Sequence, residues 1–160
     1  MLNNTGGTET IRIENATDND LPWIMELERH AFSQPWSFES VLNEVHNSDT
    51  FFAVAKGCGC EGLGFVVLRS FIDVGELMQI AVSPHFSGRG IGSLLLNSAI
   101  EHAKDCGLES VFLEVRESNV AAISLYEKSG FLPTRRRKDY YANPVEDAIE
   151  MSIKLSALKA

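Results

Sequence analysis

The N-terminal part of the chain shows first a strand-like and then a helix-like spacing of apolar residues. Apolar and polar residues alternate in Ile11–Ala16, which predicts a short strand. The next residues, Thr17-Asp-Asn-Asp20, resemble a capping box with Asp in the Glu position, so we expect a helix to begin there. Apolar residues at helical spacing then form two groups, Leu21, Ile24 and Leu27, and, after Ser37, Phe38, Val41, Leu42 and Val45.

The rest of the chain is dominated by strands, with two more helices between them. Strand-like runs occur at Thr50–Lys56, Leu63–Ser70, Val74–Val82, Ser110–Val115, Phe131–Lys138 and Ala148–Leu155. A third helix is predicted by the helical spacing of Ile91, Leu94, Leu95 and Ile100. A fourth is predicted at Asn119–Ser129, where Gly130 ends it.

The predicted order of elements is β-α-α-β-β-β-α-β-α-β-β, which describes an α/β fold with a mixed, mostly antiparallel sheet flanked by helices. The three strands between residues 50 and 82 read as an antiparallel meander. The strands before and after the third helix should be parallel, because a crossover helix connects them.

Length and composition describe one globular domain. The chain has 160 residues, of which 44% are hydrophobic, and a chain of this size buries a core of its own. Residues 1–10 are polar and rich in Gly, Thr and Asn, so we expect a loose tail there and a single domain over residues 11–155.

Charge, cysteine and histidine content exclude several function classes. The 14 basic and 22 acidic residues give a net charge of −8, which argues against general nucleic-acid binding. No apolar run is long enough to span a membrane and no secretory signal is visible, so we expect a cytoplasmic protein. We also expect a monomer. Cys58, Cys60, Cys106 and the four histidines lack the spacing of a disulfide framework or a metal site, so no metal is expected.

The strongest local signal is the glycine-rich segment Ser87-Gly-Arg-Gly-Ile-Gly92, between a predicted strand and a predicted helix. Glycines let the backbone approach a ligand closely, and the free N–H groups of a helix start attract an anion such as phosphate. The spacing matches neither the Walker loop nor the dinucleotide-binding fingerprint. A tight turn without a ligand explains the three glycines equally well at this point.

The segment Val82–Leu96 resembles the acetyl-coenzyme A signature of the GCN5-related N-acetyltransferases, the GNAT family. Gly90 and Gly92 match that signature, whereas Ser87 stands where the family usually has Gln or Arg. Arg89 would supply some of the missing positive charge. The resemblance implies the GNAT fold and acetyl-coenzyme A as co-substrate.

The resemblance narrows to the ribosomal-protein-alanine N-acetyltransferases and extends from about Ile11 to Leu155. It rests on the segments Glu28–Ser37, Leu113–Phe131, Arg135–Tyr141 and Glu146–Met151. It implies transfer of an acetyl group to a protein N-terminal α-amine, with the N-terminal alanine of ribosomal small-subunit protein eighteen as acceptor. Two alternatives stay open, an acetyltransferase for a small amine and a non-catalytic sensor of acetyl-coenzyme A.

The resemblance also assigns roles to individual residues. Glu114 matches the general base, with Glu76 as its rival, and Tyr126 matches the general acid. The matched cofactor contacts are Ile80, Ala81, Val82, Gly88, Arg89, Gly90, Ile91, Gly92, Ser93, Asn119 and Tyr126.

Structural explanations remain available for the same residues. Glu114 would fit a solvated face or an ion pair with Arg116, Tyr126 a core aromatic, and Asn119 a helix N-cap. The basic run Arg135–Lys138 reads as a solvated strand or as a substrate contact. Trp36 fits either the acceptor site or a buried anchor between the first two helices.

Overall fold

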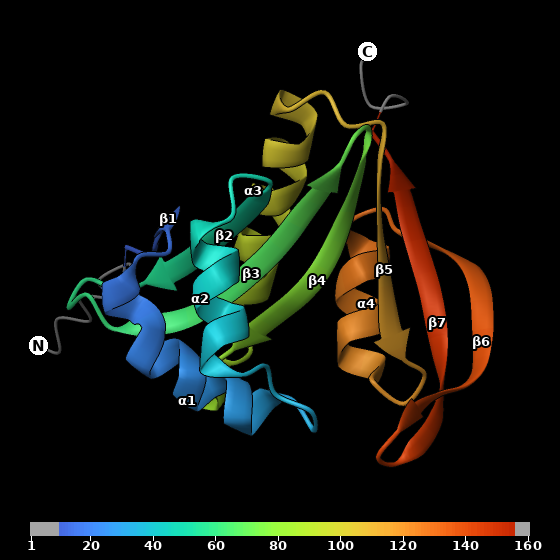
Figure 1. Ribbon diagram of the computed structural model, residues 1–160, viewed down its shortest axis with the longest axis horizontal. Coiled ribbons are helices and arrows are strands. Elements are labelled where there is room, and N and C mark those ends of the chain that lie inside the picture. The colour runs from blue at the N-terminus through green and yellow to red at the C-terminus, as the bar shows by residue number, and fades with distance from the viewer. Residues whose placement is uncertain (1–9, 156–160) are drawn as a thin grey trace, which may run out of the picture.

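The computed structural model describes residues 10–155, and within them the predicted order of strands and helices is confirmed (Figure 1). The main elements are β1 (Arg12–Asn15), α1 (Leu21–Ala31), α2 (Phe38–His46), β2 (Thr50–Lys56), β3 (Gly62–Phe71), β4 (Val74–Val82), α3 (Ile91–Asp105), β5 (Ser110–Arg116), α4 (Val120–Lys128), β6 (Leu132–Ala142) and β7 (Val145–Lys154). The predicted tail, residues 1–10, lies outside the described residues except for Thr10. No helix within residues 10–155 is long and apolar enough to cross a membrane.

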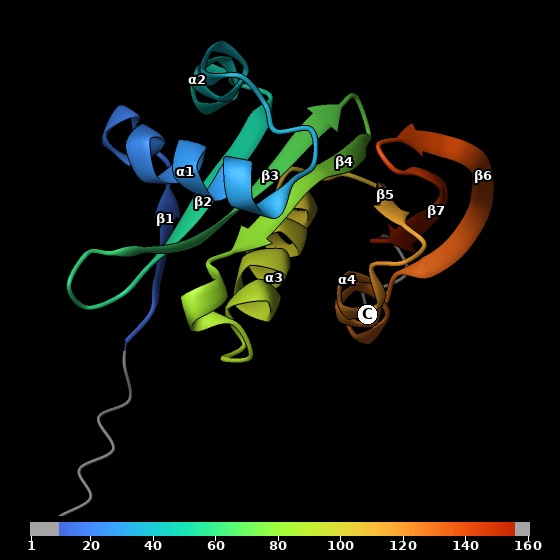
Figure 2. The same ribbon diagram turned by 90° about the horizontal axis from the view of Figure 1, so that it is seen from below.

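The strands form one mixed sheet in the order β1-β2-β3-β4-β5-β7-β6. Its pairs are antiparallel except β4 and β5, which are parallel as predicted for strands joined by a crossover helix. Helices α1 and α2 cover one face of the sheet, and α3 and α4 cover the other (Figure 2).

Alternating strand residues supply a separate core to each face. Phe52, Val54 and Phe65 pack with α1 and α2, whereas their neighbours Ala53 and Val66 pack with α3. The stripe predicted for α3 is wrong at Leu94, which is 44% exposed. The buried stripe is instead Ile91, Leu95, Leu96, Ala99, Ile100 and Ala103.

Two short 3-10 turns were not predicted, η1 (Asp18–Asp20) and η2 (Pro84–Phe86). The predicted capping box is present, with the Asp20 carboxylate accepting from the Thr17 N–H at 2.9 Å, but it caps η1 rather than α1. The C-terminal hairpin is also longer than predicted, since β6 continues beyond Lys138 and β7 starts at Val145. A register shift between Arg137 and Tyr141 interrupts the alternation on which the prediction relied.

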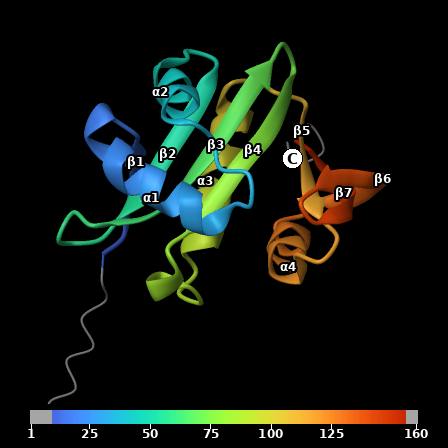
Figure 3. The same ribbon diagram turned by 60° about the horizontal axis from the view of Figure 1, so that its bottom comes forward.

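The sheet opens between β4 and β5. Only three residue pairs join these strands, from Val74–Ser110 to Glu76–Phe112, and beyond them the strands diverge (Figures 2 and 3). A β-bulge lies at the same height, because Leu68 pairs with Leu77 and Val67 with Gln79, which leaves Met78 as an extra residue in β4. Bulges bend and twist the strand that carries them, so the bulge accounts for the divergence.

Candidate active site

The glycine-rich loop lies between η2 and the first turn of α3. Gly88 and Gly90 have φ angles of +75° and +80°, which glycine adopts without strain. A Cβ at either position would meet no atom of the described chain within 4 Å, so both residues face open space. Gly90 is the N-cap of α3, and no side chain of residues 10–155 caps the first turn. Bare backbone and an uncapped helix start are the features that bind a phosphate.

The edge of β4 beside this loop has free backbone groups. Past Glu76, the β4 edge that faces β5 has no strand partner within the described sheet. An extended ligand arm with alternating donors and acceptors can pair with such an edge as an added strand does. Ile80, Ala81 and Val82 lie on this length of β4, and Ile80 and Val82 pack toward α3. Loop and edge together fit the pyrophosphate and the pantetheine arm of coenzyme A.

The other residues of the loop differ in whether their backbone or their side chain is available to a ligand. Ile91 is 2% exposed in the core beneath α3, so only its backbone is available to a ligand. Ser93 is exposed, and the Arg89 guanidinium lies 5.4 Å from the centroid of the Phe86 ring. Ser87 donates a hydrogen bond from Oγ to the Pro84 carbonyl at 3.1 Å, so its side chain stabilises the loop itself.

A cavity of about 340 Å³ occupies the opening between β4 and β5. It brings together four residues that the sequence predicted, Ile80, Glu114, Asn119 and Tyr126. The loop between α1 and α2, β4, β5, α4 and Tyr141 of the C-terminal hairpin form its walls. Ala81, Val82 and the residues from Gly88 to Ser93 do not line this cavity.

Glu114 extends from β5 beyond the last residue that pairs with β4. Its side chain is 17% exposed, and its Oε1 lies 3.2 Å from Nε of Arg137 on β6. The Tyr140 hydroxyl also hydrogen-bonds to this carboxylate, and that bond, followed by burial, raises the pKa of Tyr140 to about 12. The ion pair with Arg116 considered from the sequence is wrong, because Arg116 pairs with Glu146 at 3.3 Å.

Glu76, the rival base, lies on the neighbouring strand but does not line the cavity. Burial raises the pKa of its carboxyl, and the negative charge of Glu114 raises it further, while Arg69 opposes the change. The two carboxyls therefore influence each other, although Glu114 alone reaches the cavity wall.

Tyr126 reaches the cavity from α4, on the opposite side of the sheet. It is 7% exposed and packs against Phe131, with ring centroids 5.9 Å apart, so Tyr126 is a core aromatic, as one of the two interpretations from the sequence predicted. Burial, and secondarily Tyr141, raises the pKa of its hydroxyl well above the ordinary value. The phenol therefore keeps its proton across the physiological pH range.

Arg116 ties the walls of the cavity together. Its Nη2 donates to Ser33 Oγ at 3.1 Å and to the Asn143 carbonyl at 3.2 Å, which joins the α1–α2 loop to the β6–β7 turn. The guanidinium also lies 4.2 Å from the Tyr141 ring centroid, a cation–π contact. One side chain thus fixes two loops relative to β5.

The three arginines of the basic run form ion pairs with acidic residues of β7, of β5 and of the segment after β5. Arg136 contacts Asp147 at 2.7 Å and Glu117 at 2.8 Å, and Arg135 lies 3.7 Å from Glu150. Most of this run therefore forms ion pairs on a solvated strand, which was one of the two interpretations of the sequence, the other being a substrate contact. Arg137 differs, since it reaches both Glu114 and Glu150.

Asn119 has the structural role expected of an N-cap. Its Oδ1 accepts from the Ala122 N–H at 3.2 Å at the start of α4, and the residue also lines the cavity. Trp36 is half-buried against the core beneath α1 and α2, which agrees with the anchor reading, and it is not among the residues that line the cavity.

Two buried polar residues beside the cavity were missed by sequence reasoning. Glu28 of α1 is 0% exposed and Gln79 of β4 is 8% exposed, and they are hydrogen-bonded to each other. The helical spacing could have indicated that Glu28 is buried, because residue 28 belongs to the core-facing stripe that also holds Ile24 and Leu27. An acid on such a stripe requires a partner.

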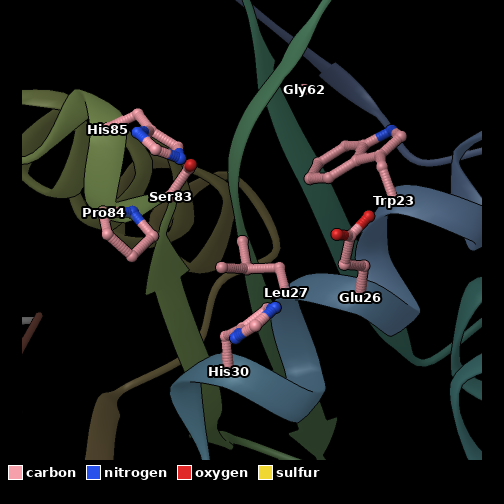
Figure 4. Close-up of a pocket in the computed structure, with 8 residues that line it drawn as sticks. All are labelled: Trp23, Glu26, Leu27, His30, Gly62, Ser83, Pro84 and His85. Atoms are coloured by element: carbon pink, nitrogen blue, oxygen red, sulfur yellow. The ribbon is translucent and has the colours of Figure 1, made fainter.

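A second cavity, of about 290 Å³, lies between α1 and the end of β4 (Figure 4). Trp23, Glu26, Leu27 and His30 of α1 face Ser83, Pro84 and His85 across it. It contains none of the residues predicted for catalysis or cofactor binding, so the opening between β4 and β5 is the better candidate for the active site.

Known proteins with this sequence pattern and fold are acetyltransferases. The model of the Acetyltransferase (GNAT) family matches residues 19–131. The chain is 35% identical over 149 residues to the [ribosomal protein bS18]-alanine N-acetyltransferase of Salmonella typhimurium, which covers 92% of this chain and 98% of that protein.

Solved structures agree with this match. The ribosomal-protein-S18-alanine N-acetyltransferase from Escherichia coli has a TM-score of 0.83 and 30% identity, covering 91% of this chain and 94% of that one. The PaiA N-acetyltransferase from Thermoplasma acidophilum, in complex with coenzyme A, has the same fold, with a TM-score of 0.76, 24% identity and coverage of 91% and 99%. The chain therefore belongs to the GNAT family, and it is an acetyl-coenzyme A-dependent N-acetyltransferase.

Proposed function

We propose that this enzyme acetylates the N-terminal alanine of ribosomal protein bS18. The names of its relatives from Salmonella typhimurium and Escherichia coli support this acceptor. The observation that supports the proposed chemistry is the cavity between β4 and β5, which Glu114 and Tyr126 both line, Glu114 from β5 and Tyr126 from α4. We further propose that residues 11–155 form the catalytic domain of a cytoplasmic monomer.

The protonation state of the acceptor amine determines how strong a general base the protein must supply. An α-amine has a pKa of about 7.7–8.0, so roughly a tenth of it is neutral at pH 7, at a cost of about 1.4 kcal/mol or less. A lysine amine, at about 10.4, costs about 4.6 kcal/mol by the same arithmetic. A single carboxylate in contact with solvent is sufficient for the α-amine.

The two proposed catalytic groups would act on different atoms, Glu114 on the attacking amine nitrogen and Tyr126 on the departing sulfur. Acetyl-coenzyme A, when bound, supplies a thioester carbonyl carbon for the amine to attack. The amine nitrogen forms the new N–C bond and passes its surplus proton to Glu114, directly or through a water, as the C–S bond breaks. Tyr126 donates its hydroxyl proton to the departing sulfur. Backbone N–H groups of Ile80–Val82 would hold the carbonyl oxygen.

A panel of acceptors tests the proposal. Acetyl-coenzyme A consumption is measured with a peptide of the bS18 N-terminus, the same peptide with its α-amine blocked, an internal-lysine peptide and spermidine. We expect kcat/KM for the free alanine peptide to exceed each of the others by about 100-fold or more. A preference for lysine or spermidine would replace the proposed acceptor. Binding of acetyl-coenzyme A without turnover on any amine would identify a sensor.

A further inference from the structure

The stretch of β6 from Arg137 to Tyr140 brings two side chains to Glu114 that a regular strand would place on opposite faces. Residues three positions apart in a strand point to opposite sides of the sheet, because the side-chain period is two. Between Arg137 and Tyr141 the register with β7 shifts, and Asp139 has a φ of +52°. This irregular stretch interrupts the alternation, and Arg137 and Tyr140 both contact the Glu114 carboxylate.

Asp147 of β7 holds this irregular stretch in place. Its Oδ1 accepts a hydrogen bond from the Asp139 N–H at 2.8 Å, and its Oδ2 accepts one from Arg136 Nε at 2.7 Å. The bond from Asp139, followed by the one from Arg136, lowers the pKa of Asp147, so this carboxylate is ionised at neutral pH. The stretch therefore has hydrogen bonds of its own where it leaves the regular ladder.

Arg137 and Tyr140 contact each other as well as Glu114. Arg137 Nε lies 3.2 Å from Glu114 Oε1, and the guanidinium carbon lies 5.5 Å from the centroid of the Tyr140 ring. The Tyr140 hydroxyl hydrogen-bonds to the same carboxylate. Arg137 Nε is buried and has no hydrogen-bond partner in the part of the chain that the structure describes, so its contact with Glu114 acts through charge. The carboxylate keeps further lone pairs for a ligand in the cavity that Glu114 lines.

The Glu114 carboxylate has other negative charges around it. Glu150 of β7 is its direct partner in the antiparallel pair with β5, and Glu76 of β4 is close enough to interact with it. Like charges that face each other across a strand pair repel. Arg137 contacts both members of the facing pair, since its Nη2 lies 3.5 Å from Glu150 Oε2. One guanidinium thus compensates two carboxylates.

This arrangement suits a carboxylate that gains and loses a proton in every turnover. When the amine passes its proton to Glu114, the carboxyl becomes neutral and its charge attraction to Arg137 is lost. Arg137 keeps Glu150 as a partner, so the half-buried guanidinium is not left unpaired at that moment. When Glu114 releases the proton to solvent, Arg137 is already in place to stabilise the anion.

We propose that Arg137 is the positioning residue of the general base: together with Tyr140 it orients the Glu114 carboxylate toward the acceptor amine and maintains its negative charge between turnovers. This inference rests on the proposed role of Glu114 in acetyl transfer. It assigns a function to one member of the basic run, whereas Arg135 and Arg136 form ion pairs with residues that do not line the cavity.

A double-mutant cycle tests whether Arg137 acts through Glu114. Values of kcat/KM for the alanine-starting peptide are measured near pH 6.5, where most of the α-amine is protonated, for the wild type, Arg137→Met, Glu114→Gln and the double variant. Arg137→Met should lower kcat/KM about 5–20-fold, an effect between that of an exposed and that of a buried ion pair, and leave the affinity for acetyl-coenzyme A unchanged. In the Glu114→Gln background the same change should cost less than about twofold, since the carboxylate that it serves is already gone.

Other substitutions in the basic run supply the controls. Arg135→Met removes a contact with Glu150 from the same strand but no contact with Glu114, so it should keep at least about half of the wild-type kcat/KM. Arg137→Lys retains the positive charge and should recover most of the activity lost in Arg137→Met. Above about pH 8 the deficit of Arg137→Met should shrink, because free amine makes the base unnecessary. Thermal melting reports folding, and Arg137→Gln replaces Arg137→Met in the cycle if the latter does not fold.

The outcomes separate this inference from the proposed acceptor. A folded Arg137→Met enzyme with wild-type activity would overturn the role of Arg137, and so would an equal loss in Arg135→Met. A full additional loss in the Glu114→Gln background would show that Arg137 acts on something other than the base, and a fully active Glu114→Gln enzyme would leave no base for it to position. If the wild type prefers another amine, only the acceptor is wrong, and the cycle is measured with that amine. Absence of turnover on every amine would overturn both proposals.

Discussion

The two faces of the sheet differ in which atoms they offer to a ligand. On the α3 face, the loop from Gly88 to Gly92 and the β4 edge at Ile80–Val82 present backbone groups, and apart from Arg89 the side chains of these residues are small or apolar. On the α1 face, the group is a side chain, Glu114, held by Arg137 and Tyr140, and the buried pair of Gln79 and Glu28 lies beside it. The opening between β4 and β5 joins the two sets.

This difference matches the chemistry of the two substrates. A pyrophosphate and an extended arm are bound by repeated N–H and C=O groups, which any sequence supplies if glycines let the backbone approach. An amine that must lose a proton needs a few charged or polar groups in defined positions, and only side chains supply them. Changes in the glycine-rich loop should therefore alter cofactor affinity, and changes in the side chains proposed for catalysis, Glu114 and Tyr126, should alter turnover.

The largest expected effect is at Gly90. Gly90→Val places a β-branched residue at a φ of +80°, where the backbone must move, and the new side chain enters the open space above the loop. We expect calorimetric titration to detect no binding of acetyl-coenzyme A. Gly107→Val is the matched control, since Gly107 follows α3 with a φ of +75° and equally open surroundings. Near-normal affinity in Gly90→Val, or equal loss in both variants, would contradict the assignment of the loop.

Tyr126 should have the next largest effect, on rate rather than affinity. Tyr126→Phe keeps the ring that packs on Phe131 and removes only the hydroxyl. If this hydroxyl protonates the sulfur, turnover in single-turnover measurements should fall about 10²–10⁴-fold. Because burial raises the pKa of Tyr126, its ionisation should produce no alkaline limb in the rate profile below about pH 10. Wild-type turnover in this variant would leave Tyr126 with its packing role alone.

Glu114 should show a smaller effect that depends on pH. With the alanine peptide, Glu114→Gln should lower kcat/KM about 10–100-fold near pH 6.5, where most of the α-amine is protonated. The deficit should shrink above about pH 8, where the free amine becomes abundant. Glu76→Gln is the comparison, because Glu76 interacts with Glu114 but does not line the cavity, and it should keep most of the wild-type rate. A larger deficit in Glu76→Gln would move the base to the neighbouring strand.

The fold and the cofactor side could be predicted from the sequence because both depend on local patterns. Apolar spacing and turn residues indicated every main strand and helix, and Gly88 and Gly90 mark positions with a positive φ. The two 3-10 turns were missed because a three-residue turn is too short to show a period. The end of β6 was missed because Asp139, with a φ of +52°, lies in an irregular stretch of the strand.

The acceptor side could not be predicted in the same way, because its contacts join residues far apart in the sequence. The ion pair of Arg137 with Glu114 depends on the register of β6 with β7 and of β7 with β5. The contact of Glu28 with Gln79 spans 51 positions and depends on the bulge, which reverses the face expected for Gln79 from simple alternation. A family resemblance can transfer single residues such as Glu114, but not the side chains that hold them.

The bulge at Met78 also bears on how this site tolerates insertions and deletions. Because Met78 has no partner on β3, its removal would leave Leu77 and Gln79 opposite the same β3 residues as before. Without the extra residue β4 would no longer bend, and the straighter strand would pair with β5 beyond Glu76. The protein would keep its sequence of catalytic side chains and lose the space between them. Deletion of this one residue would therefore change the shape of the active site without changing any of its catalytic side chains.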